Sequence, residues 1–211
     1  MNSALTISGL TKTYKDFVLD SVSFDVPEGS IVGLIGENGA GKSTTINAAL
    51  GLIKKDAGYI SIMGKDELDN DTKEQIGVVF DGSNYPEILS PKRLNRVMKN
   101  IYHSWDERTY MSLLKKFSLP ADKQISQFSK GMKMKLAISV ALSHNSKLLI
   151  LDEATSMLDV STQANVLGMI QRQMRESGGG ILLISHDEAL VKSLCDQIYV
   201  FDNTKQKERR Q

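Results

Sequence analysis

The chain has very little cysteine and no long apolar segment, and both shortages limit what it can be. Cys195 is the only cysteine in 211 residues, so no disulfide can form within the chain, which favours a reducing compartment. With one thiol and 3 scattered histidines, no zinc site is expected. The longest apolar runs, at 148–151 and 181–184, are far too short to span a bilayer, so any membrane-spanning work is expected of another chain.

Several other features are also missing. The formal net charge is only +1, without the basic surplus with which a dedicated nucleic-acid binder competes for phosphates, so no nucleic-acid partner is expected. Residues 1–10 lack the charged and apolar regions of a secretory signal. No G-x-G-x-x-G follows a candidate strand, so a dinucleotide-binding fold is not supported. The length suits one well-buried domain.

Short apolar runs alternate with stretches of helical periodicity, which is typical of an α/β domain. Runs that begin at 31, 76, 147 and 180 are apolar on both faces, as parallel strands covered by helices must be. The run 21–26 instead alternates, as expected for a half-exposed antiparallel strand near the N-terminus. Strands are predicted at 4–10, 21–26, 31–36, 59–63, 76–80, 147–151, 180–185 and 197–201.

Between residues 90 and 142 only helical signals occur. Ser90 followed by Pro91 predicts a helix start, and residues 104–107 (SWDE) have the pattern of a capping box. In QFSKGMKMKL (127–136), Ser129 is expected to cap a helix with a buried apolar stripe behind it. We therefore expect a helical insert at 86–142 within a core formed by 1–85 and 143–211.

The segment GENGAGKST (36–44) follows an apolar strand and precedes a helical pattern, and it matches G-x-x-x-x-G-K-[ST]. Glycines allow successive backbone N–H groups to point at phosphate oxygens, and the following helix adds its positive N-terminus. Lys42 would reach the β- and γ-phosphates and Ser43 would offer its hydroxyl to Mg²⁺. The predicted nucleotide-binding residues here are Gly36, Glu37, Asn38, Gly39, Ala40, Gly41, Lys42, Ser43 and Thr44.

Two other strands are expected to end in reactive side chains. The run 147–151 ends in Asp152 and Glu153; if its strand lies beside the phosphate-loop strand, Asp152 would hold Mg²⁺ and Glu153 would orient or deprotonate the attacking water. The run 180–185 delivers His186, whose imidazole could donate a hydrogen bond to the γ-phosphate or to that water.

Together these motifs resemble the nucleotide-binding domain of ABC transporters along essentially the whole chain. GENGAGKST resembles the Walker A motif, LLILDEAT (148–155) Walker B with its catalytic glutamate, SMLD (156–159) the D-loop, and FSKGM (128–132) the LSGGQ signature. The resemblance implies a P-loop NTPase fold of the RecA-like kind with an N-terminal antiparallel β layer and a helical subdomain. It assigns Tyr14 to adenine stacking and His186 to the switch histidine.

The resemblance further implies a Mg²⁺-dependent ATPase that works as a homodimer or with a paralogous ATPase subunit. Residues Ser129, Lys130, Gly131, Met132 and Asp159 would then meet ATP held by the other subunit. Separate transmembrane permease chains would place the protein at the cytoplasmic face of the cell membrane. FDGSNYPEILS (80–90) and the short length look most like exporter ATPases of the ABC-2 type, of the bacterial antimicrobial-peptide or drug-efflux kind, so export is the predicted direction.

Two positions depart from the family pattern. Asp81 stands where a glutamine is usual, and it could offer an oxygen to Mg²⁺ but adds negative charge. In the signature, Lys130 replaces a glycine and Met132 a glutamine. These changes keep open a subunit that binds ATP but hydrolyses it poorly. A ribosome- or DNA-acting ABC ATPase and a P-loop kinase are two further hypotheses, and the transported substrate is not readable from this chain.

Overall fold

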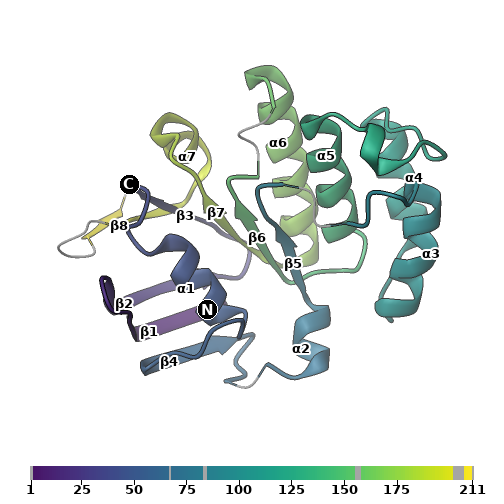
Figure 1. Cartoon of the computed structure of the whole chain (residues 1–211). Helices are drawn as coiled ribbons and strands as arrows, with labels where there is room; N and C mark the ends of the chain where they lie inside the picture. The colour runs from purple at the N-terminus through teal and green to yellow at the C-terminus, as the bar shows by residue number, and fades with distance from the viewer. Residues whose placement is uncertain (1, 67, 83–84, 155–157, 202–206, 211) are drawn as a thin grey trace.

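The chain folds around two β-sheets (Figure 1). The computed structural model describes residues 2–66, 68–82, 85–154, 158–201 and 207–210, and only the backbone at 160–161 and 207–210. The smaller sheet is antiparallel with the order β2-β1-β4. Its strands are β1 (Ser3–Thr13), β2 (Val18–Pro27) and β4 (Ala57–Ile62). This sheet is the antiparallel layer predicted near the N-terminus.

The larger sheet has the order β5-β6-β7-β3-β8-β9. Its first five strands run parallel, and they are β5 (Ile76–Val79), β6 (Leu148–Asp152), β7 (Gly180–Ile184), β3 (Ile31–Gly36) and β8 (Gln197–Phe201). Their residues are almost all buried, as the two-sided apolar runs predict. The backbone of β9 (Lys207–Arg210) pairs antiparallel with β8, a strand that the polar sequence there did not predict.

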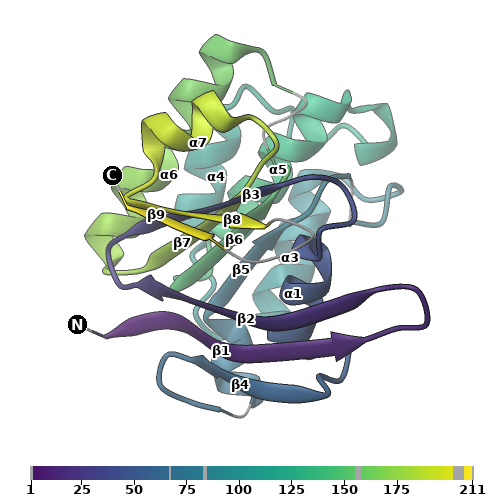
Figure 2. The same ribbon diagram turned by 90° about the vertical axis from the view of Figure 1, so that its left-hand side faces the viewer.

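Helices cover both faces of the larger sheet (Figures 1 and 2). On one face, α1 (Lys42–Ala49) lies between the two sheets and shares their apolar core. On the other face, α5 (Lys130–Ala141), α6 (Val160–Ser177) and α7 (Glu188–Leu194) pack over the strands. A short helix, α2 (Asn70–Glu74), leads into β5. The result is the predicted α/β architecture, in which the carboxyl ends of β3, β6 and β7 meet at one edge.

The segment 86–142 holds helices and no strand. Its elements are α3 (Pro91–Ile101), α4 (Glu107–Lys116), a 3₁₀ turn at Ile125–Gln127 and α5. Large apolar side chains from all of them, including Leu94, Tyr110, Ile125 and Leu136, form a core distinct from those around the larger sheet. The segment is therefore helical, as predicted, while its division from the core at residues 86 and 142 stays a prediction.

Helix starts in the insert follow the sequence signals at two places and depart from them at a third. Ser90 caps α3 with Pro91 at its first position, and Ser129 caps α5, both as predicted. The predicted capping box at 104–107 is wrong. Asp106 caps α4 by accepting hydrogen bonds from the backbone N–H groups of Arg108 and Thr109, while the Ser104 hydroxyl donates instead to the His144 carbonyl.

Length and polarity of the helices bear on the membrane question. Among the helices that the structure describes, none is long and apolar enough to cross a bilayer. The longest, α6, has 18 residues and carries charged side chains.

Candidate functional site

The predicted phosphate loop is a tight turn between β3 and α1. Gly39 and Gly41 have φ angles of 86° and 103°, in the left-handed region that favours glycine. At Gly36 the constraint is contact instead, because a Cβ there would lie 2.4 Å from the carbonyl oxygen of Phe201. Helix α1 begins after Gly41, and no side chain accepts a hydrogen bond from its first backbone N–H groups. These N–H groups are left on the side of the loop. This is the arrangement that binds an anion.

Lys42 lies under this loop. Its residue is only 8% exposed, and its Nζ donates hydrogen bonds to the carbonyl oxygens of Gly36, at 2.5 Å, and Glu37, at 2.9 Å. Burial lowers the pKa of Lys42, while the nearby carboxylates of Glu153 and Asp152 act in the opposite direction. The ammonium therefore sits between the loop and the carboxylates at the strand ends.

Asp152 ends β6, but β6 is not the neighbour of β3 that the sequence suggested. Strand β7 lies between them, with Ile184 paired to Asp152 on one side and to Leu34 on the other. Asp152 and Lys42 still interact electrostatically across this strand. Burial, and then the charge of Glu153, raise the pKa of Asp152. A carboxylate in such a setting gains from a cation beside it.

Glu153 and His186 are joined at the ends of β6 and β7. The Nδ1 of His186 lies 2.9 Å from Oε2 of Glu153, within hydrogen-bond distance. Glu153 has a φ of 51°, unusual for a residue with a side chain, and its backbone N–H donates to the Ile184 carbonyl oxygen at 3.1 Å. Strained backbone of this kind, costing about 1–3 kcal/mol, often occurs at functional sites.

Asp81 joins the same cluster from the next strand outward. It follows β5, which pairs with β6, and its side chain is exposed. Its negative charge contributes to raising the pKa of Asp152. The structure thus brings together five predicted residues: Lys42, Asp81, Asp152, Glu153 and His186.

The aromatic turn between β1 and β2 lies on the flank of the phosphate loop. Tyr14 is 43% exposed, and its ring centroid is 6.4 Å from that of Phe17. Phe17, which the motifs did not single out, packs close to the loop, because its Cζ would lie 3.0 Å from a Cβ added at Gly41. The only sequence signal for Phe17 is its place in TKTYKDF (11–17) beside Tyr14.

The signature residues lie apart from this cluster, at the start of α5. Ser129 accepts a hydrogen bond from the backbone N–H of Met132, at 3.3 Å, and the side chains of Ser129 and Lys130 are exposed. Gly131 and Met132 are partly buried. In the described part of the chain, no hydrogen bond or ion pair links these four residues to residues 36–44. Their functional assignment needs a second molecule.

Asp159 caps α6 by accepting a hydrogen bond from the backbone N–H of Thr162, at 2.9 Å, and it is exposed.

The remaining predicted residues of the phosphate loop differ in their exposure to solvent. Glu37, Asn38, Gly39 and Ser43 are exposed, Thr44 is intermediate, and Ala40 and Gly41 are buried. Residues 155–157, which belong to the predicted Walker B and D-loop motifs, lie outside the described residues.

The site holds oxygen donors of the kind that Mg²⁺ takes. No three or more His, Cys, Asp or Glu residues among those described are grouped so that they could hold a metal alone. A hydroxyl at Ser43 and a carboxylate at Asp152 nevertheless suit an ion that prefers one or two protein ligands together with phosphate oxygens. The residues present therefore fit Mg²⁺ bound with a nucleotide.

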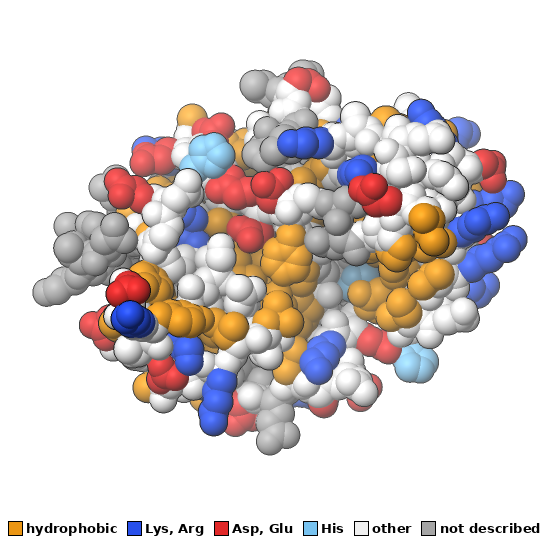
Figure 3. Space-filling view, in the orientation of Figure 1, with side chains coloured by type: hydrophobic (Ala, Val, Ile, Leu, Met, Phe, Trp, Pro, Cys, Tyr) orange, Lys and Arg blue, Asp and Glu red, His pale blue; other side chains and the backbone are white. Residues whose placement is uncertain are grey.

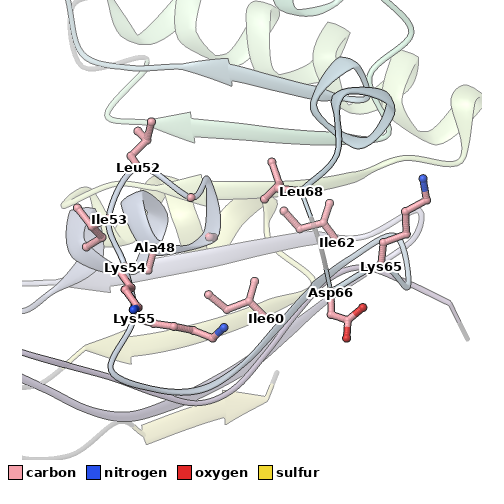
Figure 4. A pocket seen from close by; sticks show the side chains of 12 residues that line it. Ala48, Leu52, Ile53, Lys54, Lys55, Ile60, Ile62, Lys65, Asp66 and Leu68 are labelled. Carbon is pink, nitrogen blue, oxygen red and sulfur yellow. The ribbon is translucent and has the colours of Figure 1, made fainter.

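A hollow of about 380 Å³ opens beside the end of α1 (Figure 4). Apolar side chains of Ile53, Ile60, Ile62 and Leu68 line it, and Lys54, Lys55 and Lys65 stand at its border with Asp66. Leu52, which also lines it, is 65% exposed. On the face seen in Figure 3, hydrophobic side chains gather across the middle of the molecule. An uncovered apolar surface of this kind is typical of a protein contact.

Known proteins of one family are similar to this chain. Residues 19–156 match the family model described as ABC transporter. The chain is 34% identical over 197 residues to the methionine import ATP-binding protein MetN of Mannheimia succiniciproducens, covering 87% of this chain and 56% of that protein. It is also 34% identical over 200 residues to MetN 1 of Listeria monocytogenes, covering 87% and 57%. The chain thus spans less than three fifths of the length of these two relatives.

Solved structures give the same result for the fold. An ATP-binding subunit of an ABC transporter has a TM-score of 0.87 and 30% identity, covering 98% of this chain and 90% of that one. The protein cbiO1 from Clostridium perfringens has a TM-score of 0.79 over 98% of this chain and 88% of its own, at 24% identity. The second likeness concerns the fold alone.

Proposed function

The chain belongs to the ABC transporter family, and on this premise we propose that it takes ATP with Mg²⁺ and is the ATP-hydrolysing subunit of a membrane transporter. The observation that carries the proposal is the cluster in which Lys42 lies under the phosphate loop beside Asp152, with Glu153 and His186 hydrogen-bonded at the neighbouring strand ends.

ATP would bind with its phosphates over the start of α1 and its base near Tyr14. Lys42 now donates to two loop carbonyls, so binding would exchange those bonds for the β- and γ-phosphate oxygens. Mg²⁺, held by Ser43 and Asp152 with Asp81 nearby, would neutralise phosphate charge. The buried position of Lys42 strengthens its attraction for the triphosphate.

Glu153 would act on the attacking water and His186 would hold Glu153 in place. The hydrogen bond between them fixes the carboxylate at the end of β6, from which Glu153 would orient a water molecule. His186 is exposed on the side toward the loop opening, where it could also donate to the γ-phosphate.

The second half of the site would come from another copy or a paralogous ATPase subunit. Ser129 and Gly131 stand at the exposed start of α5, whose positive N-terminus suits a γ-phosphate. Lys130 would add a cation there, and Asp159 would lie at the same subunit boundary. Two subunits would close on two ATP molecules and push on the transmembrane chains. Hydrolysis would then let the subunits open again.

A separate transmembrane permease would dock on the apolar hollow beside α1. The exposed Leu52 and the apolar lining offer contact area, and three lysines against one aspartate at the border favour an acidic partner segment. This contact would hold the subunit at the cytoplasmic face of the membrane.

The direction of transport is the least supported part of the sequence prediction. Export was predicted from resemblance to ABC-2 exporter ATPases, but the two curated MetN relatives are named as methionine import proteins. We therefore propose import as the first direction to test and keep export as the competing one. Uptake and efflux measured in one vesicle preparation with the cognate permease would distinguish them.

The decisive experiment on the ATPase itself is Glu153→Gln. This change removes the base but keeps the shape of the side chain, so turnover should fall by about 10²–10⁴-fold while ATP-bound dimers accumulate. Size-exclusion chromatography with saturating ATP and a phosphate-release assay measure the two effects. The matched control is Glu176→Gln, an exposed position on α6. A Glu153→Gln protein that stays monomeric and active would overturn the proposal.

A further inference from the structure

The helical insert carries a strong positive charge, of which the proposed ATP site uses only Lys130. Residues 86–142 contain eleven Lys and Arg against four Asp and Glu, a net charge of +7, whereas the rest of the chain has a net charge of −6. In Figure 3, Lys and Arg side chains gather at the edge of the molecule where Figure 1 places α3 and α4. The near-neutral net charge of the chain is therefore the sum of a positive insert and a negative remainder.

Part of this charge surrounds a hollow of about 330 Å³ at the beginning of α3. Three cations line it, Lys92, Arg93 and Arg96, together with the carboxylate of Asp122. Lys92 Nζ lies 3.5 Å from Asp122 Oδ1 in a largely exposed ion pair. The guanidinium groups of Arg93 and Arg96 have no ion-pair partner among the described residues, which leaves two cations to meet an external anion.

The walls of this basic hollow are fixed by backbone hydrogen bonds. The N–H groups of Lys92 and Ile125 donate to the carbonyl oxygens of Ala121 and Leu89, both at 2.9 Å, and Ser126 N–H donates to Glu87 at 3.0 Å. Segments 87–93 and 121–126 are therefore joined without a ligand. A preformed hollow costs little ordering free energy when an anion enters.

The attraction comes from side chains rather than from the helix end. Pro91 has no N–H, Lys92 N–H is bonded to Ala121, and Arg93 N–H is capped by the Ser90 hydroxyl. Guanidinium groups are suited to phosphate because their planar fork can make two parallel hydrogen bonds to it. The chemistry of the hollow therefore favours a phosphate-type anion.

Apolar side chains continue from the basic hollow along the outer side of α3. Ile88, at its mouth, is 73% exposed. Val97 and Ile101 are 40% and 53% exposed, and they follow Arg93 at intervals of four residues, which places the three on one side of the helix. Cations beside exposed aliphatic side chains are typical of surfaces that lie on anionic membranes.

We propose that this basic hollow binds the headgroup of an anionic phospholipid, with Ile88, Val97 and Ile101 at the acyl-chain boundary. The proposal rests on the proposed function for the presence of a membrane nearby. Headgroup contact would orient the helical insert on the bilayer beside the permease, in addition to the docking at the hollow beside α1. An acidic protein segment is the competing occupant.

The test is vesicle cosedimentation of the purified chain without permease or ATP, so its outcome does not depend on ATPase activity. Vesicles of phosphatidylcholine alone are compared with vesicles that also contain phosphatidylglycerol. The chain should bind only the anionic vesicles. Each cation near such a surface contributes about 1 kcal/mol, or about fivefold in affinity, so Arg93→Gln with Arg96→Gln should weaken binding roughly 20- to 30-fold.

The matched control is Lys115→Gln with Lys116→Gln, an equal loss of charge at exposed positions of α4 in the same insert. Its binding should be close to that of the parent chain, and circular dichroism should show both variants folded. Equal losses in both variants would overturn the proposal, because binding would then follow net charge alone. Binding to neutral vesicles would also overturn it, as would displacement by free phosphate or by polyglutamate at constant ionic strength.

Discussion

The two halves of the proposed ATP site differ in how far this chain supports each by itself. In one half, Lys42 is bonded to two carbonyl oxygens of the phosphate loop, Asp152 ends a buried strand, and Glu153 and His186 lie within hydrogen-bond distance of each other. At the start of α5, Ser129 and Lys130 are exposed, and Ser129 accepts a hydrogen bond from Met132 of its own helix. One half is thus preorganised in the single chain, whereas the other would become functional only when a second subunit approaches.

The largest expected effect is on the preorganised half. Lys42→Ala removes the cation under the phosphate loop, and turnover should fall by about two orders of magnitude or more because phosphate charge is no longer compensated. A phosphate-release assay measures this, with Lys116→Ala as an exposed-lysine control. Unchanged turnover in Lys42→Ala would show that the strand-end cluster is not the ATP site.

A smaller effect is expected on the other half from Lys130→Gly. If the Lys130 cation attracts ATP held by the second subunit, its removal should weaken ATP-dependent dimerisation by roughly fivefold, the effect of about 1 kcal/mol for an exposed charge. Sedimentation velocity with ATP in the Glu153→Gln background measures it. Tighter dimerisation would reverse the interpretation, since Lys130 would then obstruct close approach of the two backbones.

The smallest expected change in basal turnover comes from Asp81→Gln. Without the negative charge of Asp81, the pKa of Asp152 should fall, so the acid limb of the pH–rate profile should move to lower pH. Stimulation by the permease should change more than basal turnover, by roughly fivefold if the coupling is about 1 kcal/mol. Equal effects on both would place Asp81 simply within the metal shell.

Local signals in the sequence predicted most of the strands and the residues at their ends. The two-sided apolar runs identified β3, β5, β6 and β7, and the glycines of 36–41 identified the phosphate loop, because each depends on neighbours in the chain. The order of strands was less accessible. That β7 separates β3 from β6 depends on pairing between segments far apart in sequence, which no local pattern encodes.

Side-chain competition explains the other differences. Ser104 has the right spacing for a capping box, but its hydroxyl donates to His144, 40 residues away, and Asp106 takes the cap. The motifs did not single out Phe17 as a site residue, because its contact with the phosphate loop arises only when the β1–β2 turn folds over Gly41. Backbone pairing of β9 with β8 adds a strand in a polar segment where the sequence predicted none.

The division of charge between the insert and the rest of the chain makes the molecule an electric dipole. In the proposed head-to-tail pair, the insert of one subunit would face the phosphate-loop side of the other, so the segments with net charges of +7 and −6 would lie in antiparallel order. Long-range attraction of this kind orients two proteins before they touch and weakens as salt shortens the screening length. The same charges that would attract a membrane would therefore also guide two copies into the arrangement in which each completes the other's site.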